Sequence, residues 1–193
     1  MLAAVILSGG ASRRMGSPKA LLAYQGRPFL EHLLEVAQHP KISTRRVVLG
    51  ADAEPIAKEI HLNPDEIVIN DEWEQGQLSS IQAALRSLPA NIEGMLLLLI
   101  DHPLISGALV ADLIEAFYSS GKPIVLPLYR GRRGHPLIFS AALFPELMSA
   151  PLETGARHVV WQHEGEIQPV ETLEEGCVLN LNDPDTLQRT LGR

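Results

Sequence analysis

A glycine-rich segment with three cationic side chains follows the first apolar run of the chain. Residues 1–7 read MLAAVIL, and residues 8–19 read SGGASRRMGSPK, with cations at Arg13, Arg14 and Lys19. Glycines let backbone N–H groups close around an anion, because no Cβ blocks the approach. Arginine can bind phosphate oxygens as a fork, and lysine can bind them as a point charge. The pattern predicts a site for nucleotide phosphates.

The spacing of this segment separates it from the two best-known phosphate loops. Gly9, Gly10 and Gly16 fit neither the dinucleotide pattern G-x-G-x-x-G nor the P-loop pattern G-x-x-x-x-G-K-[ST]. Glycines and cations alone are equally compatible with an ordinary turn carrying solvated arginines. The full string G-G-x-S-x-R-M-G-x-x-K is more specific. It resembles the nucleotide-binding signature of the nucleotidyltransferases that activate sugars and the molybdenum cofactor.

A carboxylate follows the longest later apolar run. Asp101 comes directly after residues 95–100, MLLLLI. Open α/β sheets bind ligands outside the carboxyl ends of their strands, so we expect Asp101 and the glycine loop on one rim. A carboxylate beside phosphates suits Mg²⁺, while Arg14 and Lys19 could neutralise a leaving diphosphate. The alternative is a turn-former or helix cap before Pro103.

Short apolar runs alternate with amphipathic stretches, which favours a three-layer α/β fold with a mainly parallel sheet. We expect strands over 3–7, 46–49, 66–69, 95–100 and 124–126, and helices over 28–38, 53–60, 79–88, 107–118, 141–148, 155–162 and 184–191. No linker interrupts the pattern, so we predict one domain over 1–193. Its Rossmann-like nucleotide-binding half covers about 1–105, and its acceptor-binding half covers about 106–193.

Composition excludes several classes of function. The 193 residues carry a net charge of −7, which argues against broad nucleic-acid binding. Cys177 is the single cysteine, so neither an intrachain disulfide nor a cysteine zinc cluster is expected. We expect a protein of a reducing cytoplasm. The apolar start lacks the charged region and cleavage pattern of a signal peptide. Residues 95–100 are too short to span a bilayer, so no membrane anchor is predicted.

Further motifs extend the resemblance across nearly the whole chain. The segment N-D-x-W-x-x-G-Q-x-S-S over 70–80 resembles the part of the family that contacts the base and ribose, and Asp101-His102-Pro103 resembles its magnesium-holding step. Gly-His-Pro at 134–136 and Gly-Ala-Arg at 155–157 are similar to segments of the molybdenum-cofactor cytidylyltransferases. Asn-Leu-Asn-Asp-Pro at 180–184 is similar to their last motif, where a second metal contact is expected.

The resemblance implies a nucleotide-diphospho-sugar transferase type of fold and a role for each matching residue. The implied nucleotide-binding residues are Leu7, Ser8, Gly9, Gly10, Arg14, Lys19, Asn70, Gly76, Ser79 and Ser80. The implied acceptor-binding residues are Gly134, His135, Pro136 and Arg157, and the implied metal ligands are Asp101 and Asn182. Arg14, Lys19 and Asp101 are the implied catalytic residues.

By the same resemblance, the reaction joins CMP from CTP to a molybdopterin-type cofactor and releases diphosphate, with Mg²⁺ as cofactor and transient contact with a molybdoenzyme. Three departures from the cytidylyltransferase pattern leave the base open. Ser8-Gly9-Gly10 and the two asparagines at 180 and 182 are closer to a guanylyltransferase that uses GTP, and Thr154 stands where an acidic residue is expected. The motifs are also compatible with a sugar-phosphate nucleotidyltransferase and with a non-catalytic chaperone that binds the cofactor.

Aromatic side chains and serines receive weaker assignments. We expect Trp73 to border the base, Trp161 to pack its helix, and His102 to lie at the surface although it could approach the metal. His135 is expected to contact pterin or phosphate, in the neutral or the charged form. Ser79 reads more readily as a helix N-cap than as a ligand contact. The arginines at 130, 132 and 133 could receive an anionic pterin or be solvated.

Overall fold

The structure is a computed structural model that describes residues 1–12 and 15–191. Its strands are β1 Leu2–Ser8, β2 Ala23–Tyr24, β3 Arg27–Pro28, β4 Ile42–Leu49, β5 Ile67–Ile69, β6 Gly94–Leu99, β7 Ile124–Tyr129, β8 Arg132–Arg133, β9 Leu137–Ser140 and β10 Ile167–Glu171. Its α-helices are α1 Phe29–Val36, α2 Ala53–Glu59, α3 Gln77–Ser87, α4 Gly107–Ser120, α5 Phe144–Ser149, α6 Arg157–Gln162 and α7 Pro184–Leu191. None of the described helices is long and apolar enough to cross a membrane.

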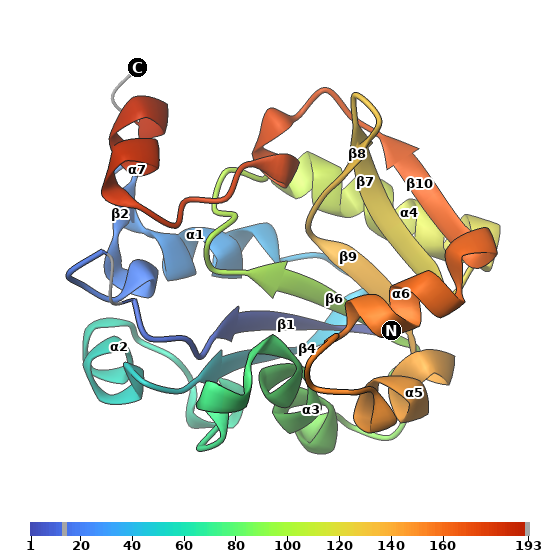
Figure 1. The fold of residues 1–193 in the computed structure, drawn as a ribbon, viewed down its shortest axis with the longest axis horizontal. Helices are drawn as coiled ribbons and strands as arrows, with labels where there is room; N and C mark the ends of the chain where they lie inside the picture. Colours follow the sequence, from blue (N-terminus) through green and yellow to red (C-terminus); the bar gives the residue numbers. More distant parts are fainter. Residues whose placement is uncertain (13–14, 192–193) are drawn as a thin grey trace.

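The central sheet has the order β10-β7-β9-β6-β1-β4-β5, with β8 paired to β7 (Figure 1). Strand β1 lies between β4 and β6 and is parallel to both; its Ile6 stands opposite Val47 and Leu98. Strand β9 is antiparallel to β6 and β7. The sheet is therefore mainly parallel, as predicted, with β9 antiparallel to both of its neighbours.

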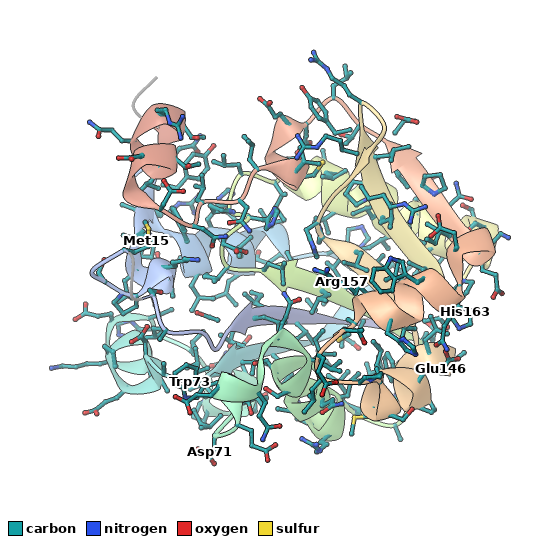
Figure 2. The ribbon with its side chains drawn as sticks, in the orientation of Figure 1. Met15, Asp71, Trp73, Glu146, Arg157 and His163 are labelled. Carbon is teal, nitrogen blue, oxygen red and sulfur yellow. The ribbon has the colours of Figure 1, made fainter. Side chains whose placement is uncertain are left out.

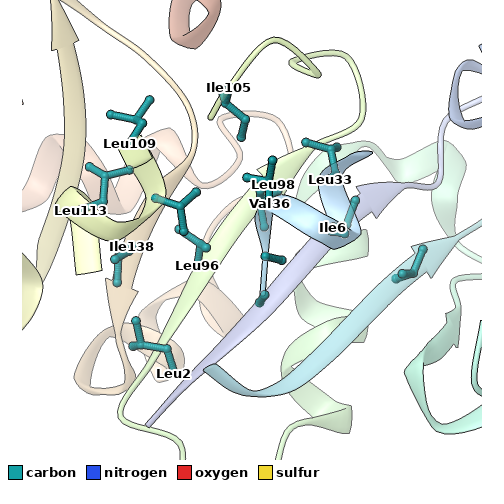
Figure 3. Packing of buried hydrophobic residues seen from close by; sticks show 14 of the residues in the cluster. Leu2, Ile6, Leu33, Val36, Leu96, Leu98, Ile105, Leu109, Leu113 and Ile138 are labelled. Atoms are coloured by element: carbon teal, nitrogen blue, oxygen red, sulfur yellow. The ribbon is translucent and has the colours of Figure 1, made fainter. Parts of the chain in front are cut away.

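Alternate residues of β1 feed two different hydrophobic layers. Every residue of β1 is buried, and Ile6 packs with α1 and α4, whereas Val5 and Leu7 pack with α3, α5 and α6. A strand covered on both faces needs apolar side chains on both, because successive side chains point to opposite faces. Figure 3 shows the first layer, to which β6 contributes Leu98, α1 contributes Leu33 and α4 contributes Leu109. The three-layer prediction is confirmed.

Three strands of the second half, β8, β9 and β10, were not predicted from the sequence; β8 has two residues and pairs with β7. Strand β9 is a short apolar run of four residues, and β10 reads IQPVE with no fully buried residue. Neither has the length or alternation that marks a strand by itself. Both form because neighbouring strands offer edges for hydrogen bonding: β9 pairs with β6 and β7, and β10 pairs with β7.

The chain returns to the strands of its first half through residues 174–183, which we name the closing segment. Its first residue, Glu174, accepts a hydrogen bond from the backbone N–H of Ser106 at 3.1 Å, at the start of α4. Next, Gly176 lies so close to residue 104 that a Cβ would stand 1.9 Å from the Leu104 carbonyl oxygen. A glycine is required there, and the segment is anchored beside the loop that carries Asp101.

Candidate functional site

A cavity of about 250 Å³, the rim cavity, opens where β1, β4 and β6 end. These strands are parallel, so their carboxyl ends meet at one edge of the sheet. The predicted residues that line it are Leu7, Ser8, Gly9, Gly10, Lys19, Gly76, Ser80 and Asp101. The rim expected from the sequence thus holds the glycine loop, a lysine and a carboxylate together. Arg14 and its neighbour Arg13 lie outside the described residues.

Two glycines of the rim are required by packing rather than by the ligand. A Cβ at Gly9 would lie 2.9 Å from the Ser80 hydroxyl oxygen. A Cβ at Gly50 would lie 2.3 Å from the Gly9 carbonyl oxygen and 2.7 Å from Cβ of Trp73. Around Gly10, in contrast, the space for a Cβ is open. The glycine loop, the end of β4 and Trp73 therefore fit together with no room for side chains at positions 9 and 50.

A buried hydrogen-bond network holds the segment that leads into α3. The Asn70 side-chain amide donates to the hydroxyls of Ser79 and Ser80, each at 2.9 Å, and the Ser79 hydroxyl donates to the Gly76 carbonyl oxygen at 2.8 Å. Asn70 and Ser79 are buried and do not line the rim cavity. The expected N-cap role of Ser79 is wrong: α3 begins at Gln77 and its N-cap is Gly76. Asn70 and Ser79 therefore stabilise the segment over 70–80 by hydrogen bonds and are not part of the cavity wall.

The closing segment reaches both ionisable groups of the proposed chemistry. The backbone N–H of Leu181 donates to the Asp101 carbonyl oxygen at 2.8 Å, and the Asn180 amide donates to Asp101 Oδ2 at 2.9 Å. The Lys19 ammonium donates to Asn182 Oδ1. The backbone N–H of Lys19 donates to the Ser12 hydroxyl at 2.9 Å, so the lysine is fixed to its own loop as well. Two neutral amides therefore orient one cation and one carboxylate.

A second cavity of about 450 Å³, the side cavity, lies against the β6, β7 and β9 strands. Apolar side chains such as Leu97 and Phe139 line it, together with the cations Arg133 and Arg157. Arg133 forms an ion pair with Glu164 at its exposed edge. Among the predicted acceptor residues, those lining this cavity are Gly134, His135 and Arg157, whereas Pro136 does not. Arg130 and Arg132 line neither cavity.

Two histidines lie beside Asp101 and the side cavity. The rings of His102 and His135 are 5.0 Å apart between centroids, and the Nδ1 atom of each is buried without a hydrogen-bond partner among the described residues. Burial lowers the pKa of His102, and burial together with the neighbouring His102 lowers the pKa of His135 to about 4. Both imidazoles are neutral near pH 7. The expected surface position of His102 is wrong, because this side chain is only 7% exposed.

The two tryptophans lie in different surroundings. Trp73 lines the rim cavity, and Figure 2 labels it on the segment that precedes α3. The prediction that Trp161 packs its helix is wrong, because this side chain is 58% exposed on α6. A single tryptophan in an amphipathic stretch does not indicate which side of the helix meets the core. The neighbouring Val159 takes the buried position.

Asp52 was not singled out from the sequence, and Gln77 appeared there only within the motif over 70–80, without a role of its own. Asp52, at the start of α2, lines the rim cavity. Gln77, the first residue of α3, lines both the rim cavity and the side cavity. The signal for each was its place directly after a strand or turn that carries other site residues. In the described part of the chain, no three His, Cys, Asp or Glu side chains converge as a metal site.

A glycine loop, a lysine and a carboxylate at the strand ends, with a second cavity beside them, define a class of enzyme that binds nucleotides at a sheet edge. The model of the MobA-like NTP transferase domain matches residues 4–167. The chain therefore belongs to the MobA-like NTP transferase family, and it is a nucleotidyltransferase by that membership.

Known proteins resemble the chain in sequence and in fold over most of its length. The chain is 31% identical to a nicotine blue oxidoreductase of Paenarthrobacter nicotinovorans, over 97% of this chain and 95% of that protein. It is 34% identical to a molybdenum cofactor guanylyltransferase of Rhizobium meliloti strain 1021, over 84% of this chain and 69% of that protein. A solved homologue of Rv0371c from Mycobacterium sp. strain JC1 superposes with a TM-score of 0.84 at 27% identity, covering 99% and 95% of the two chains.

Proposed function

We propose that this protein transfers a nucleoside monophosphate from CTP to a molybdopterin-type cofactor and releases diphosphate. The observation that carries the proposal is the pair of neighbouring cavities. One holds Lys19 and Asp101 at the glycine loop, and the other combines apolar walls with Arg157. A triphosphate suits the first, and a partly apolar acceptor that ends in a phosphate suits the second. The name of the Rhizobium relative supports the same class of acceptor.

The proposed chemistry needs few protein groups. An oxygen of the acceptor phosphate attacks the α-phosphorus, the bond from that phosphorus to the bridging oxygen breaks, and diphosphate leaves with the electron pair. An ionised phosphate is already a nucleophile, so no protein base has to remove a proton. Lys19 would neutralise charge on the departing diphosphate, and backbone N–H groups of the glycine loop would hold its oxygens. The protein acts by positioning and electrostatics.

The residues of the rim fit one divalent cation, for which we propose Mg²⁺. Magnesium prefers one or two carboxylates plus phosphate oxygens, and Asp101 offers one oxygen that the Asn180 amide does not use. When bound, the metal would polarise the α-phosphate. Asn182 was predicted as a second metal ligand, but its oxygen accepts from Lys19. We therefore assign Asn182 to orienting the lysine, and Asp101 to the metal.

The choice of base is tested by comparing triphosphates. Gly-His-Pro and Gly-Ala-Arg favour CTP, whereas Ser8-Gly9-Gly10 and the relative named guanylyltransferase favour GTP. The purified protein is mixed with authentic molybdenum cofactor and each triphosphate, and diphosphate release is measured. We expect release chiefly with CTP. Faster release with GTP would assign guanylyl transfer, and release with a sugar phosphate alone would assign sugar-nucleotide synthesis. Cofactor binding without release would indicate a chaperone.

A second candidate function is oxidoreduction. The relative named nicotine blue oxidoreductase matches almost the full length of both chains. The closing segment also gives Asp101 an amide neighbour rather than a second carboxylate, which makes a weaker metal site than paired carboxylates would. The same preparation should therefore be mixed with a reduced nicotinamide cofactor and with nicotine blue, the dye in that relative's name, and the absorbance of the dye followed. Dye bleaching that needs both components, without diphosphate release in the first assay, would favour the oxidoreductase.

A further inference from the structure

Gln77 is the described residue common to both cavities. The rim cavity is lined by Lys19 and Asp101, the side cavity by His135 and Arg157, and Gln77 contributes to each wall. In Figure 2, Trp73 marks the segment that leads into α3, and Arg157 marks α6 beside the side cavity. The first turn of α3 therefore lies at the boundary between the two compartments. Resting on the proposed function, we propose that the Gln77 amide bridges the two substrates.

The local structure holds Gln77 in this place. Gly76 has a φ of +97°, in the left-handed region that favours glycine, and turns the chain into α3 at Gln77. On the other side, Leu78 is 1% exposed and fastens the first turn to the core. The Ser79 hydroxyl ties the same turn to the carbonyl oxygens of Gly76 and Glu72. The backbone is fixed, while the Gln77 side chain is exposed.

The chemistry of an amide suits a junction between two phosphates. A glutamine side chain has two N–H donors on one nitrogen, so one amide can donate to an oxygen of each phosphate. Two negatively charged groups repel, and a shared donor offsets part of that repulsion. Because the amide is neutral, it does not compete with Lys19 for the leaving diphosphate. Gln77 would thus align the attacking oxygen with the α-phosphorus, and it takes no proton.

The test measures coupling between ligands as well as turnover. Binding of a non-hydrolysable α,β-methylene CTP is measured by calorimetry, alone and with saturating molybdopterin cofactor, in the wild type, Gln77→Ala and Gln77→Glu. The control is Gln75→Ala, the same change at an exposed residue two positions earlier that lines neither cavity. Steady-state kinetics give kcat and KM for both substrates, and thermal unfolding gives Tm.

We expect Gln77→Ala to bind the nucleotide alone within about twofold of wild type, because hydrogen bonds to the triphosphate remain. The cofactor-dependent gain in nucleotide affinity should fall about tenfold, as expected when a hydrogen bond to charged groups is lost. In turnover, kcat should fall and KM for the cofactor should rise, while Tm stays unchanged. Gln77→Glu should be worse than Gln77→Ala, because it adds a negative charge between two phosphates.

Coupling and turnover in Gln77→Ala equal to those of Gln75→Ala would overturn the bridging role, even if the wild type is fully active. Gln77→Glu performing as well as the wild type would also overturn it. A wild type that shows Gln77-dependent coupling without diphosphate release keeps the bridge and removes the proposed transferase activity. Absence of both coupling and release in the wild type overturns both proposals.

Discussion

The rim cavity and the side cavity differ in how the chain builds them. The rim cavity is formed by short loops at the ends of parallel strands, and its wall includes the glycines at positions 9, 10 and 76. The side cavity is formed by side chains of β6, β7 and β9, with a pair of arginines. Backbone N–H groups bind phosphate whatever base is attached to it. The rim is therefore suited to what all triphosphates share, and under the proposed function the side cavity would be the part that selects the acceptor.

Asp101 gives the largest expected effect, because it is the carboxylate that we assign to the metal. Asp101→Asn should lower diphosphate release by about 10²- to 10³-fold, comparable to removing one group that stabilises transition-state charge. The unfolding midpoint should change little, since the amide can still meet Asn180. Stopped assays at several Mg²⁺ concentrations check this. Activity that persists at all of them would remove Asp101 from the reaction.

Substitutions of Lys19 and Arg157 test whether the rim cavity binds the triphosphate and the side cavity binds the cofactor. Lys19→Ala should raise KM for the triphosphate and leave KM for the cofactor nearly unchanged, and Arg157→Ala should do the reverse. Each change removes a charge-assisted contact of about 1.5–3 kcal/mol, or roughly 10- to 100-fold. Arg130→Ala is the control, because this arginine lines neither cavity. Equal changes in both KM values for both variants would contradict the two-cavity assignment.

Substitutions at Gly50 and Gly10 distinguish a glycine that packing requires from a glycine with open space around it. Gly50→Ala should lower the free energy of unfolding by about 1–3 kcal/mol, because a Cβ overpacks the contact with Gly9 and Trp73. Gly10→Ala should leave stability unchanged, since its Cβ would meet open space. Urea unfolding of the two variants measures the difference. Equal stability for both would mean that the loop relaxes around the new methyl group.

His135 predicts a modest dependence of stability on pH that belongs to the side cavity. Its folded pKa is lowered from 6.5 to about 4 by burial and by His102. Between these values the unfolded chain binds a proton that the folded chain does not, so stability falls as pH falls. The slope from this residue is at most about 1.4 kcal/mol per pH unit. Urea unfolding at about pH 7 and pH 5 should show a smaller loss for His135→Gln than for wild type. Equal losses of unfolding free energy in the two proteins would mean that His135 is not the source of the acid sensitivity.

The parts of the fold that were predictable carry their signal locally. The runs that became β1 and β6 are apolar on both faces, and the helical spacing of the first predicted helix is visible in α1. The ends of β1, β6 and α1 in the structure differ from the predicted ends by one or two residues. β4 was predicted four residues too short, because Ile42–Arg45 includes polar side chains that its neighbours in the sheet tolerate. Strands β9 and β10 depend on partners, so no local pattern marked them.

In the site, too, the positions that depend on local sequence were predictable and those that depend on distant residues were not. Leu7 to Gly10 and Asp101 lie together because they stand at the carboxyl ends of β1 and β6, whose direction was predictable, and the loop after β1 brings Lys19 to the same edge. The burial of His102 was not predictable, because it depends on the closing segment and on His135, which are distant in sequence. The exposure of Trp161 and the helix start at Gln77 likewise depend on what packs against each turn.

By itself, the sequence determined the α/β class, the family and the identity of the chemical groups at the glycine loop and at Asp101. Composition, period and motif spacing are properties of neighbouring residues and need no tertiary information. Only the tertiary structure decided that Asn180 and Asn182 orient Asp101 and Lys19, and that Gln77 lies between two cavities. Those relations join residues far apart in the chain, and packing of the closing segment and α3 against the sheet brings them together.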